Sequence, residues 1–136
     1  MIRYNQIKES DSIPKGSTLL LKNTEKAPQL GARYGQDVEP SGFYCLIYNE
    51  KFQKHLLNLP NYELYSFNIK NPLIVDITKD TIQWKKDLAL EYSAKGKALT
   101  KKLLQKGYDI IIAYDSKYKE TGEIIVLDTK KLKKEE

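Results

Sequence analysis

The segment that most constrains the fold spans residues 107–133, GYDIIIAYDSKYKETGEIIVLDTKKLK. Its apolar runs predict a buried strand from Ile110 to Tyr114, a polar turn closed by Thr121-Gly122, and a second strand from Glu123 to Leu127. Because side chains alternate across a strand, Glu123 is expected to share one face with the apolar residues two and four positions later. A glutamate that opens an otherwise apolar strand is a candidate for chemistry, although it could also be a plain strand-edge charge.

The rest of the chain contains several shorter apolar runs. Strands are predicted where such runs are continuous or alternate with polar residues, at residues 18–21, 43–48, 63–69 and 73–77. The region from Asn23 to Gly42 holds glycines and prolines without a clean period. A loop of this length in a small domain is uncommon, so it is predicted to be either a ligand-covering loop or an irregular surface loop.

Helical patterns fall between the predicted strands. Asn49 can cap a short helix from Glu50 to about Asn58. Asp80 or Thr81 can cap a second helix, in which apolar residues recur every four positions, and Gly107 stops a third, lysine-rich amphipathic stretch. The sequence leaves open whether the last two form one kinked helix or two separate ones.

This order of elements predicts an α+β domain with two or three helices and a mixed or mainly antiparallel sheet. Strands gather toward both ends of the chain and helices fall between them, without a regular βαβ repeat. With 136 residues, of which 40% are hydrophobic and 30% charged, the chain is expected to form a single domain. Residues 1–15 are expected to form a polar lead-in and residues 129–136 a charged tail.

Charge and composition narrow the classes of partner and compartment. The net charge of +5 favours approach to an anionic partner such as RNA, DNA or a dinucleotide, although lysines along a helix are also common on a solvated face. No apolar run reaches the length of a membrane helix, and no signal peptide is expected. One cysteine and one histidine argue against a disulfide or a zinc site, so a cytoplasmic protein without a metal is expected.

Most candidate catalytic residues have simpler structural interpretations. His55 falls in a predicted helix beside leucines, and Trp84 is expected to anchor a helix in the core. Cys45 lies in an apolar strand, where burial makes a thiol inert. Neither phosphate-binding glycine pattern, G-x-x-x-x-G-K-[ST] or G-x-G-x-x-G, occurs. A rigidly held Glu123 could instead bind a ribose hydroxyl, stabilise a developing cation or deprotonate a nucleophile.

Four segments, in the correct order, resemble ADP-ribosyltransferase domains. Residues 107–133 resemble their closing strands, a Gly-Tyr-Asp strand followed by a Glu-hydrophobic-Val-hydrophobic-Asp strand and a basic end. SFNIKNPLIVD resembles the middle strands of bacterial and phage members. TLLLKN falls where the family's first strand ends in His-Gly or Arg-Gly, and SGFYCLI falls where its second strand reads Gly-hydrophobic-Tyr-Phe. The resemblance covers residues 18–133 and implies the family's split, mainly antiparallel sheet.

The resemblance also implies roles for five residues. Glu123 matches the catalytic glutamate, which bonds the nicotinamide-ribose hydroxyl and supports the oxocarbenium-like state as nicotinamide leaves. Tyr44 matches the tyrosine that stacks on nicotinamide, and is otherwise a core aromatic residue. Lys22 and Asn23 stand at the His/Arg-Gly position, where Lys22 would grip the adenosine ribose or a phosphate and Asn23 would approach the nicotinamide amide. Tyr34 would contact NAD from the long loop.

The function implied by the resemblance is mono-ADP-ribosyl transfer, a glycosyltransferase reaction. ADP-ribose would move from NAD to a protein side chain or a nucleic acid, with release of nicotinamide and without a metal. A small domain of this kind fits a phage or bacterial toxin, effector or defence component. Because Lys22-Asn23 departs from the family's pattern, the alternative is a catalytically degenerate binding module for an anionic protein or nucleic acid. A third class is an unrelated α+β nucleic-acid binder, whose binding would not depend on Glu123.

Overall fold

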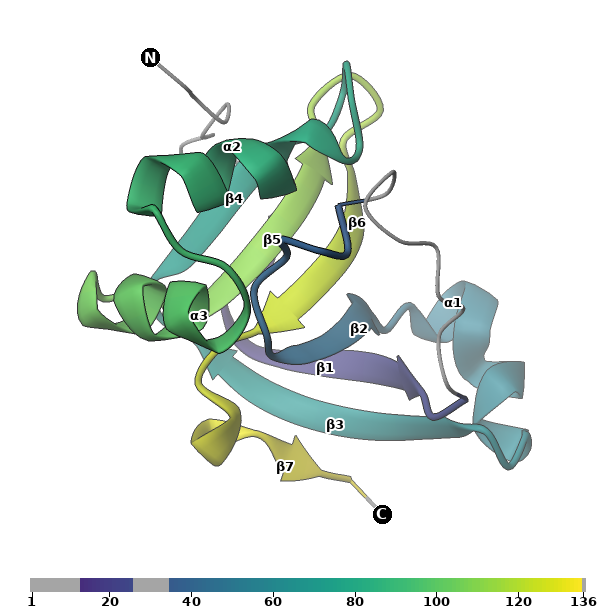
Figure 1. Ribbon diagram of the computed structural model, residues 1–136. Coiled ribbons are helices and arrows are strands. Elements are labelled where there is room, and N and C mark those ends of the chain that lie inside the picture. Colours follow the sequence, from purple (N-terminus) through teal and green to yellow (C-terminus); the bar gives the residue numbers. More distant parts are fainter. Residues whose placement is uncertain (1–12, 26–34, 136) are drawn as a thin grey trace.

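Seven strands form one sheet in the computed structural model, which describes residues 13–25 and 35–135 (Figure 1). The strands are β1 (Gly16–Asn23), β2 (Phe43–Ile47), β3 (Tyr62–Ile69), β4 (Pro72–Asp76), β5 (Ile110–Asp115), β6 (Glu120–Val126) and β7 (Lys133–Lys134). The helices are α1 (Glu50–Gln53), α2 (Gln83–Tyr92) and α3 (Gly96–Gln105), with the 3-10 helices η2 (Lys54–Asn58) and η3 (Thr129–Lys131). Most of the predicted lead-in, and Tyr34, lie outside the described residues.

The strand order is β4-β5-β6-β2-β1-β3-β7. Among the described strands β4 and β5 are parallel, and the other five neighbouring pairs are antiparallel. The structure therefore confirms the predicted α+β class with a mainly antiparallel sheet and three helices. The pairing is uneven, because β1 pairs with β3 along its whole length but with β2 only at Leu20 and Leu21. This narrow seam between β1 and β2 divides the sheet into a β4-β5-β6-β2 half and a β1-β3-β7 half.

Apolar side chains are buried on both faces of the sheet because isoleucines and leucines fill its central strands. Along β5, Ile110 and Ile112 point into one core cluster and Ile111 points into the other, as the alternation of a strand requires. We call the cluster that α2 and α3 cover the helix-side cluster, and the other the opposite cluster (Figure 1). Trp84 and Leu88 of α2 are 3% and 0% exposed and anchor this helix on the sheet, as predicted for Trp84.

The helices α2 and α3 are separate. Ser93, which follows α2, has a left-handed φ of 51°, and Gly96, which begins α3, has a φ of 56°. Two residues with left-handed φ so close together prevent a continuous helix. The sequence had left open whether this region forms one kinked helix or two, and the structure shows two. The short helix predicted from Glu50 to Asn58 is α-helical only as far as Gln53 and continues as η2.

The hairpin between β5 and β6 turns earlier than predicted. Its turn closes before Glu120, and the Thr121-Gly122 pair lies inside β6, so the predicted position of the turn is wrong. The Asp115 carboxylate accepts hydrogen bonds from the backbone N–H groups of Lys117 at 2.9 Å and the residue after it at 3.1 Å. Lys119 then takes a left-handed φ of 55°. An aspartate that bonds to the following amides provides the turn chemistry that the glycine was expected to provide.

The two ends of the described chain are more involved in the fold than their charge predicted. Ile13, which falls in the predicted lead-in, is 4% exposed and packs in the opposite cluster. At the other end, β7 pairs with β3 at Ser66 and Tyr65, and Lys134 forms an ion pair with Glu63. The predicted charged tail therefore closes one edge of the sheet, and lysines at an edge disfavour further strand pairing.

The start of β2 packs so closely on β6 that only glycine fits at position 42. A Cβ atom on Gly42 would lie 2.6 Å from the Val126 carbonyl oxygen and 2.9 Å from Cγ2 of Ile125. We expect Gly42→Ala to lower the free energy of unfolding by about 1–3 kcal/mol, because the backbone must move. Chemical denaturation of this variant beside Gly122→Ala tests the explanation. A Cβ at Gly122 comes too close only to the flexible end of Ile77, at 2.9 Å, and otherwise makes ordinary contacts with Ala113. An equal loss in both variants would therefore contradict the explanation.

Candidate active site

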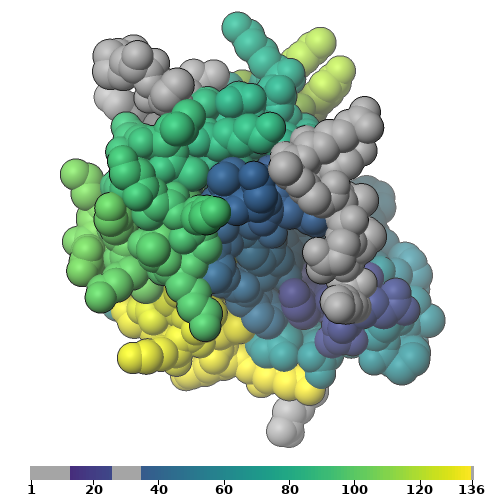
Figure 2. Space-filling model, viewed as in Figure 1, coloured from purple at the N-terminus to yellow at the C-terminus, as the bar shows by residue number. Residues whose placement is uncertain are grey.

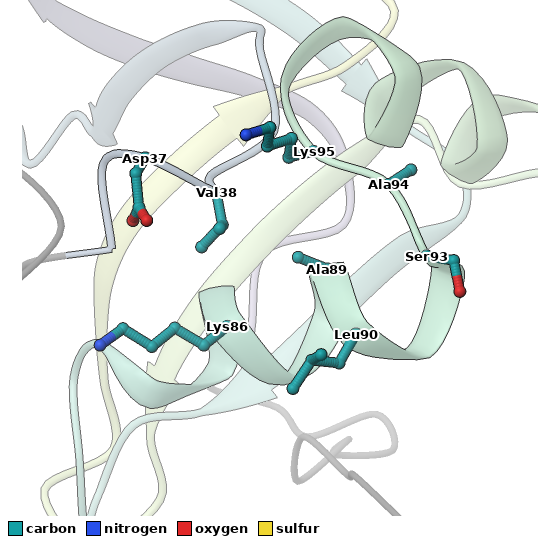
Figure 3. A pocket seen from close by; sticks show the side chains of 8 residues that line it. All are labelled: Asp37, Val38, Lys86, Ala89, Leu90, Ser93, Ala94 and Lys95. Carbon is teal, nitrogen blue, oxygen red and sulfur yellow. The ribbon is translucent and has the colours of Figure 1, made fainter.

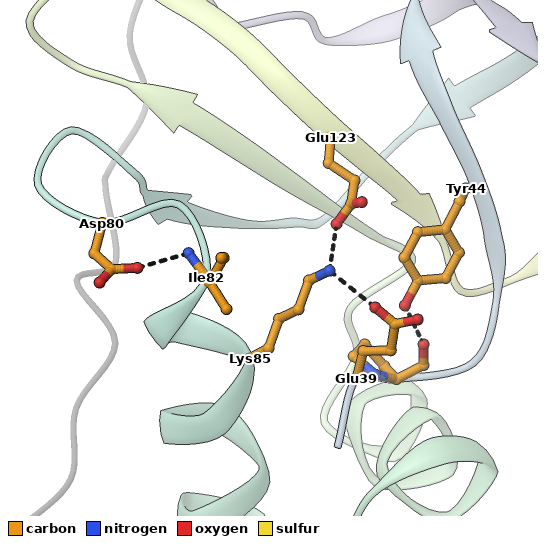
Figure 4. A network of polar contacts seen from close by, with 7 residues as sticks. Glu39, Tyr44, Asp80, Ile82, Lys85 and Glu123 are labelled. Carbon is orange, nitrogen blue, oxygen red and sulfur yellow. Dashed lines mark hydrogen bonds and ion pairs between the residues drawn. The ribbon is translucent and has the colours of Figure 1, made fainter. Parts of the chain in front are cut away.

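A buried lysine brings two carboxylates and an aromatic ring together on the helix side of the sheet (Figure 4). The Lys85 ammonium lies 2.9 Å from Glu39 Oε2, 3.0 Å from Glu123 Oε1 and 5.8 Å from the centre of the Tyr44 ring. The lysine side chain is 9% exposed, whereas the side chains of Glu39 and Glu123 are 25% and 41% exposed. These four residues form the Lys85 cluster, in which a ligand can reach Glu123 more easily than Lys85.

A β-bulge places Glu123 at this position. The pairing of β5 with β6 shifts between Ile112 and Tyr114, so that Ala113 of β5 lies opposite both Gly122 and Glu123 of β6. Such a bulge bends a strand and redirects a side chain, and bulges are enriched beside active sites. As predicted, Glu123 lies on the face of the apolar residues two and four positions later, which belong to the helix-side cluster.

The helix α2 supplies Lys85. The Asp80 carboxylate accepts hydrogen bonds from the backbone N–H groups of Ile82 at 2.7 Å and Gln83 at 2.8 Å, where the helix begins. The N-cap residue is Ile82, which makes no side-chain cap hydrogen bond, so the predicted cap position at Asp80 or Thr81 is wrong, although Asp80 still bonds to the first amides of the helix. With Trp84 buried against the sheet, the next residue, Lys85, extends toward β6 and the loop before β2 (Figure 4).

The loop before β2 supplies Glu39 and is fastened to α3. The Glu39 carbonyl accepts a hydrogen bond from the Gly96 N–H at 3.1 Å, and Pro40 forms an isolated bridge with Gly96. The hydroxyl of Tyr44 donates to the Pro40 carbonyl. Burial, followed by the charges of Glu39 and Glu123, raises the pKa of Tyr44 well above its ordinary value. Tyr44 therefore remains a neutral phenol whose hydroxyl helps to hold the loop.

The Lys85 ammonium keeps its charge because its neighbours stabilise it. Burial lowers the pKa of a lysine, but the hydrogen bond to Glu39 and the charge of Glu123 outweigh this effect and raise the pKa of Lys85 above its ordinary value. The centres of the Tyr44 and Trp84 rings lie 5.8 and 5.7 Å from Nζ and also favour a cation. Lys85 is therefore suited to orienting carboxylates and not to acting as a nucleophile.

The predicted NAD-binding pair of β1 lies apart from the Lys85 cluster. The Lys22 ammonium donates to the Tyr44 carbonyl at 2.7 Å and lies 4.9 Å from the centre of the Phe43 ring. Because Phe43 packs against the opposite cluster, the Lys22 side chain lies on the other side of the sheet from α2. The side-chain oxygen of Asn23 accepts hydrogen bonds from the Glu25 N–H at 2.9 Å and from Asn61 at 3.4 Å.

Of the four predicted site residues in the described part of the chain, the structure thus brings two, Tyr44 and Glu123, into the Lys85 cluster. Sequence reasoning missed Lys85, although one signal for it existed. Lys85 precedes Leu88 by three positions and Tyr92 by seven, so it lies on the apolar stripe of α2, where a lysine is unusual. Glu39 carried no comparable signal, because it lies in a loop without a period.

The other candidate residues occupy the structural roles that their sequence context predicted. Cys45 is 7% exposed, and burial, opposed by the charge of Lys22, raises its pKa to about 12, which is the inert thiol expected. His55 lies on the exposed surface of η2. A further carboxylate, that of Asp76 at the end of β4, accepts hydrogen bonds from Thr78 and Ser116.

Within the described residues, the helices and the potential metal ligands add no assignment to this geometry. Within the described part of the chain, no helix has the length and apolar character needed to cross a membrane. Among the same residues, no group of three or more His, Cys, Asp or Glu side chains could hold a metal ion. Comparison with known proteins adds no assignment either, because the chain matches no protein-family model, no curated protein and no solved structure.

Proposed function

We propose that this protein is a mono-ADP-ribosyltransferase that moves ADP-ribose from NAD to a macromolecular acceptor. The observation that carries the proposal is the meeting of Glu123 and Tyr44 around Lys85. These two residues come from separate segments, and the resemblance assigned both to the nicotinamide end of one site. The Glu123 carboxylate is exposed enough for a ligand to reach it.

The seam between β1 and β2 supports a split sheet of the kind that the proposal requires. The two strands pair at Leu20 and Leu21 and are not paired at Lys22 and Asn23. The unpaired end of β1 lies beside Tyr44, whose carbonyl accepts a hydrogen bond from the Lys22 ammonium. The seam therefore opens beyond Leu21. Lys22 and Asn23 lie on the β1 side of this opening, and Tyr44 lies on its β2 side.

In this mechanism NAD is consumed as a substrate and Glu123 is the catalytic residue. Its carboxylate would accept a hydrogen bond from a hydroxyl of the nicotinamide ribose and stabilise positive charge that develops on the sugar. The bond between the ribose carbon and the nicotinamide nitrogen breaks, and its electron pair leaves with nicotinamide. An oxygen or nitrogen of the acceptor then bonds to the same carbon and loses a proton. Lys85 holds one carboxylate oxygen of Glu123 in place.

A second candidate is a binding module that retains this scaffold without turnover. The favouring observation is that Lys85 already neutralises Glu123, while Lys22 is bonded within the protein to Tyr44 and lies over Phe43. A site whose lysines already form an ion pair or a hydrogen bond within the protein would bind the NAD phosphates weakly. This candidate retains the scaffold as a surface for an anionic partner.

Incubation with NAD labelled in the adenylate phosphate, in the presence of a cell lysate, tests the proposal. We expect one nicotinamide released for each label transferred, and digestion with protease or nuclease then identifies the acceptor class. Absence of nicotinamide release, together with absence of NAD binding in calorimetry, would exclude the transferase. Binding of an anionic protein or nucleic acid without NAD turnover would support the second candidate.

A further inference from the structure

A pocket of about 580 Å³ lies where α2 turns into α3, apart from the Lys85 cluster (Figure 3). The residues that line it are Asp37, Val38, Lys86, Ala89, Leu90, Ser93, Ala94 and Lys95. The aliphatic side chains form its floor, and Asp37, Lys86 and Lys95 extend around its margin (Figure 3). Its volume falls in the range of sites that hold small ligands. With two lysines and one aspartate at its margin, this apolar floor suits a flat apolar group whose negative charge lies outside the pocket, on the side of the lysines.

The helix beside the pocket has an unbalanced positive charge. Residues 95–106, which comprise α3 and its flanking residues, include five lysines and no aspartate or glutamate. Lys97 and Lys101 are both exposed and four residues apart, so they lie on one face of α3, one turn from each other. Within the described residues, Lys95, Lys97 and Lys101 form no ion pair.

The pocket borders the start of α3, because Lys95, which lines it, directly precedes this helix. In Figure 2 the segment after residue 35, in dark blue, lies directly against the green helices α2 and α3. The pocket opens at this boundary, because Val38 comes from the first segment and Ala89 and Ala94 come from the second. A chain-like anion could therefore place one group in the pocket while its next charges lie along α3.

We propose that this surface binds single-stranded nucleic acid, with one base in the pocket and the neighbouring phosphates on Lys95, Lys97 and Lys101. Phosphates are the anions that a row of unpaired lysines neutralises, and each base offers an apolar face to the aliphatic floor. A paired base inside a duplex could not enter the pocket. Binding here does not depend on the proposed transfer reaction. Only the further idea that the bound strand is also the acceptor rests on that function.

Fluorescence anisotropy with a short labelled single-stranded oligonucleotide tests the lysine row. The variant combines Lys95→Ala, Lys97→Ala and Lys101→Ala, and its control combines Lys51→Ala, Lys54→Ala and Lys70→Ala, three exposed lysines elsewhere. We expect the slope of log K against log salt to fall by about 2 in the first variant, because each phosphate contact to a single strand contributes about 0.7. Equal slopes in the two variants would overturn the proposal.

The pocket is tested with Leu90→Gln, which changes an exposed side chain and should leave the fold intact. Loss of apolar contact with the base should weaken binding about tenfold, whereas Leu59→Gln, at another exposed leucine, should not change it. Glu123→Gln should bind the oligonucleotide as the wild type does, which separates this proposal from the transferase. Unchanged binding by Leu90→Gln, or binding of phosphatidylserine vesicles without binding of the oligonucleotide, would contradict it.

Discussion

Replacing Glu123 with glutamine should reduce ADP-ribosyl transfer by at least about 100-fold while the protein remains folded. Glutamine has nearly the same shape and can still accept a hydrogen bond from Lys85, but it carries no negative charge. The loss should therefore appear where positive charge develops on the ribose, that is, in kcat more than in KM. Release of nicotinamide, measured over a range of NAD concentrations, gives both constants.

The matched control for this variant is Glu120→Gln, which removes the same charge from the exposed start of the same strand. Because the Glu123 side chain is 41% exposed, its ion pair contributes little to folding, and both variants should unfold within about 1 kcal/mol of the wild type. Equal activity in the two variants would remove Glu123 from the mechanism.

Replacing Lys85 with methionine should lower the free energy of unfolding by about 1–3 kcal/mol and also impair transfer. Methionine fills a similar volume but leaves Glu39 and Glu123 facing each other without the cation that now separates them. The expected loss is smaller than for a fully buried pair, because water reaches both carboxylates. Lys86→Met is the control, since the next residue forms no ion pair within the described residues. Similar losses for both variants would rule out the cluster as their source.

The same ion pairs predict how stability depends on pH in alkali. The pKa of Lys85 is raised in the folded protein, so its stabilising contribution is complete below the unfolded pKa of about 10.4. It is lost as the pH rises through the folded pKa, because the ammonium then gives up its proton. Denaturation curves above about pH 10 should show this loss in the wild type. A loss of the same size in Lys85→Met would assign it to other groups.

Local patterns were sufficient to predict the strands β1 to β6 and the face on which Glu123 lies, but not β7, which falls in the predicted tail. Alternation along β5 and β6 depends only on neighbours in the sequence, and the bulge at Gly122 left the shared face unchanged. The position of the hairpin turn could not be predicted in this way, because an aspartate side chain replaced the expected glycine. A correct strand therefore did not ensure a correct turn.

The candidate site was harder to predict because its central residue depends on tertiary structure. Lys85 has its role only because α2, β6 and the loop before β2 converge, and these segments are far apart in the sequence. Lys22 illustrates the reverse case. Its place at the end of β1 was predicted, but the strand's twofold alternation directs its side chain toward Phe43 and away from the helices.

The seam between β1 and β2 also determines how the sheet can move. A sheet bends most easily where few backbone hydrogen bonds cross it. Here β1 and β2 pair at Leu20 and Leu21, and one more backbone hydrogen bond runs from the Tyr48 N–H to the Leu19 carbonyl. Every member of the Lys85 cluster belongs to the half that contains β6, whereas Lys22 belongs to the other half. We expect hinge motion at the seam to change the opening beside Tyr44 while the geometry around Glu123 stays rigid.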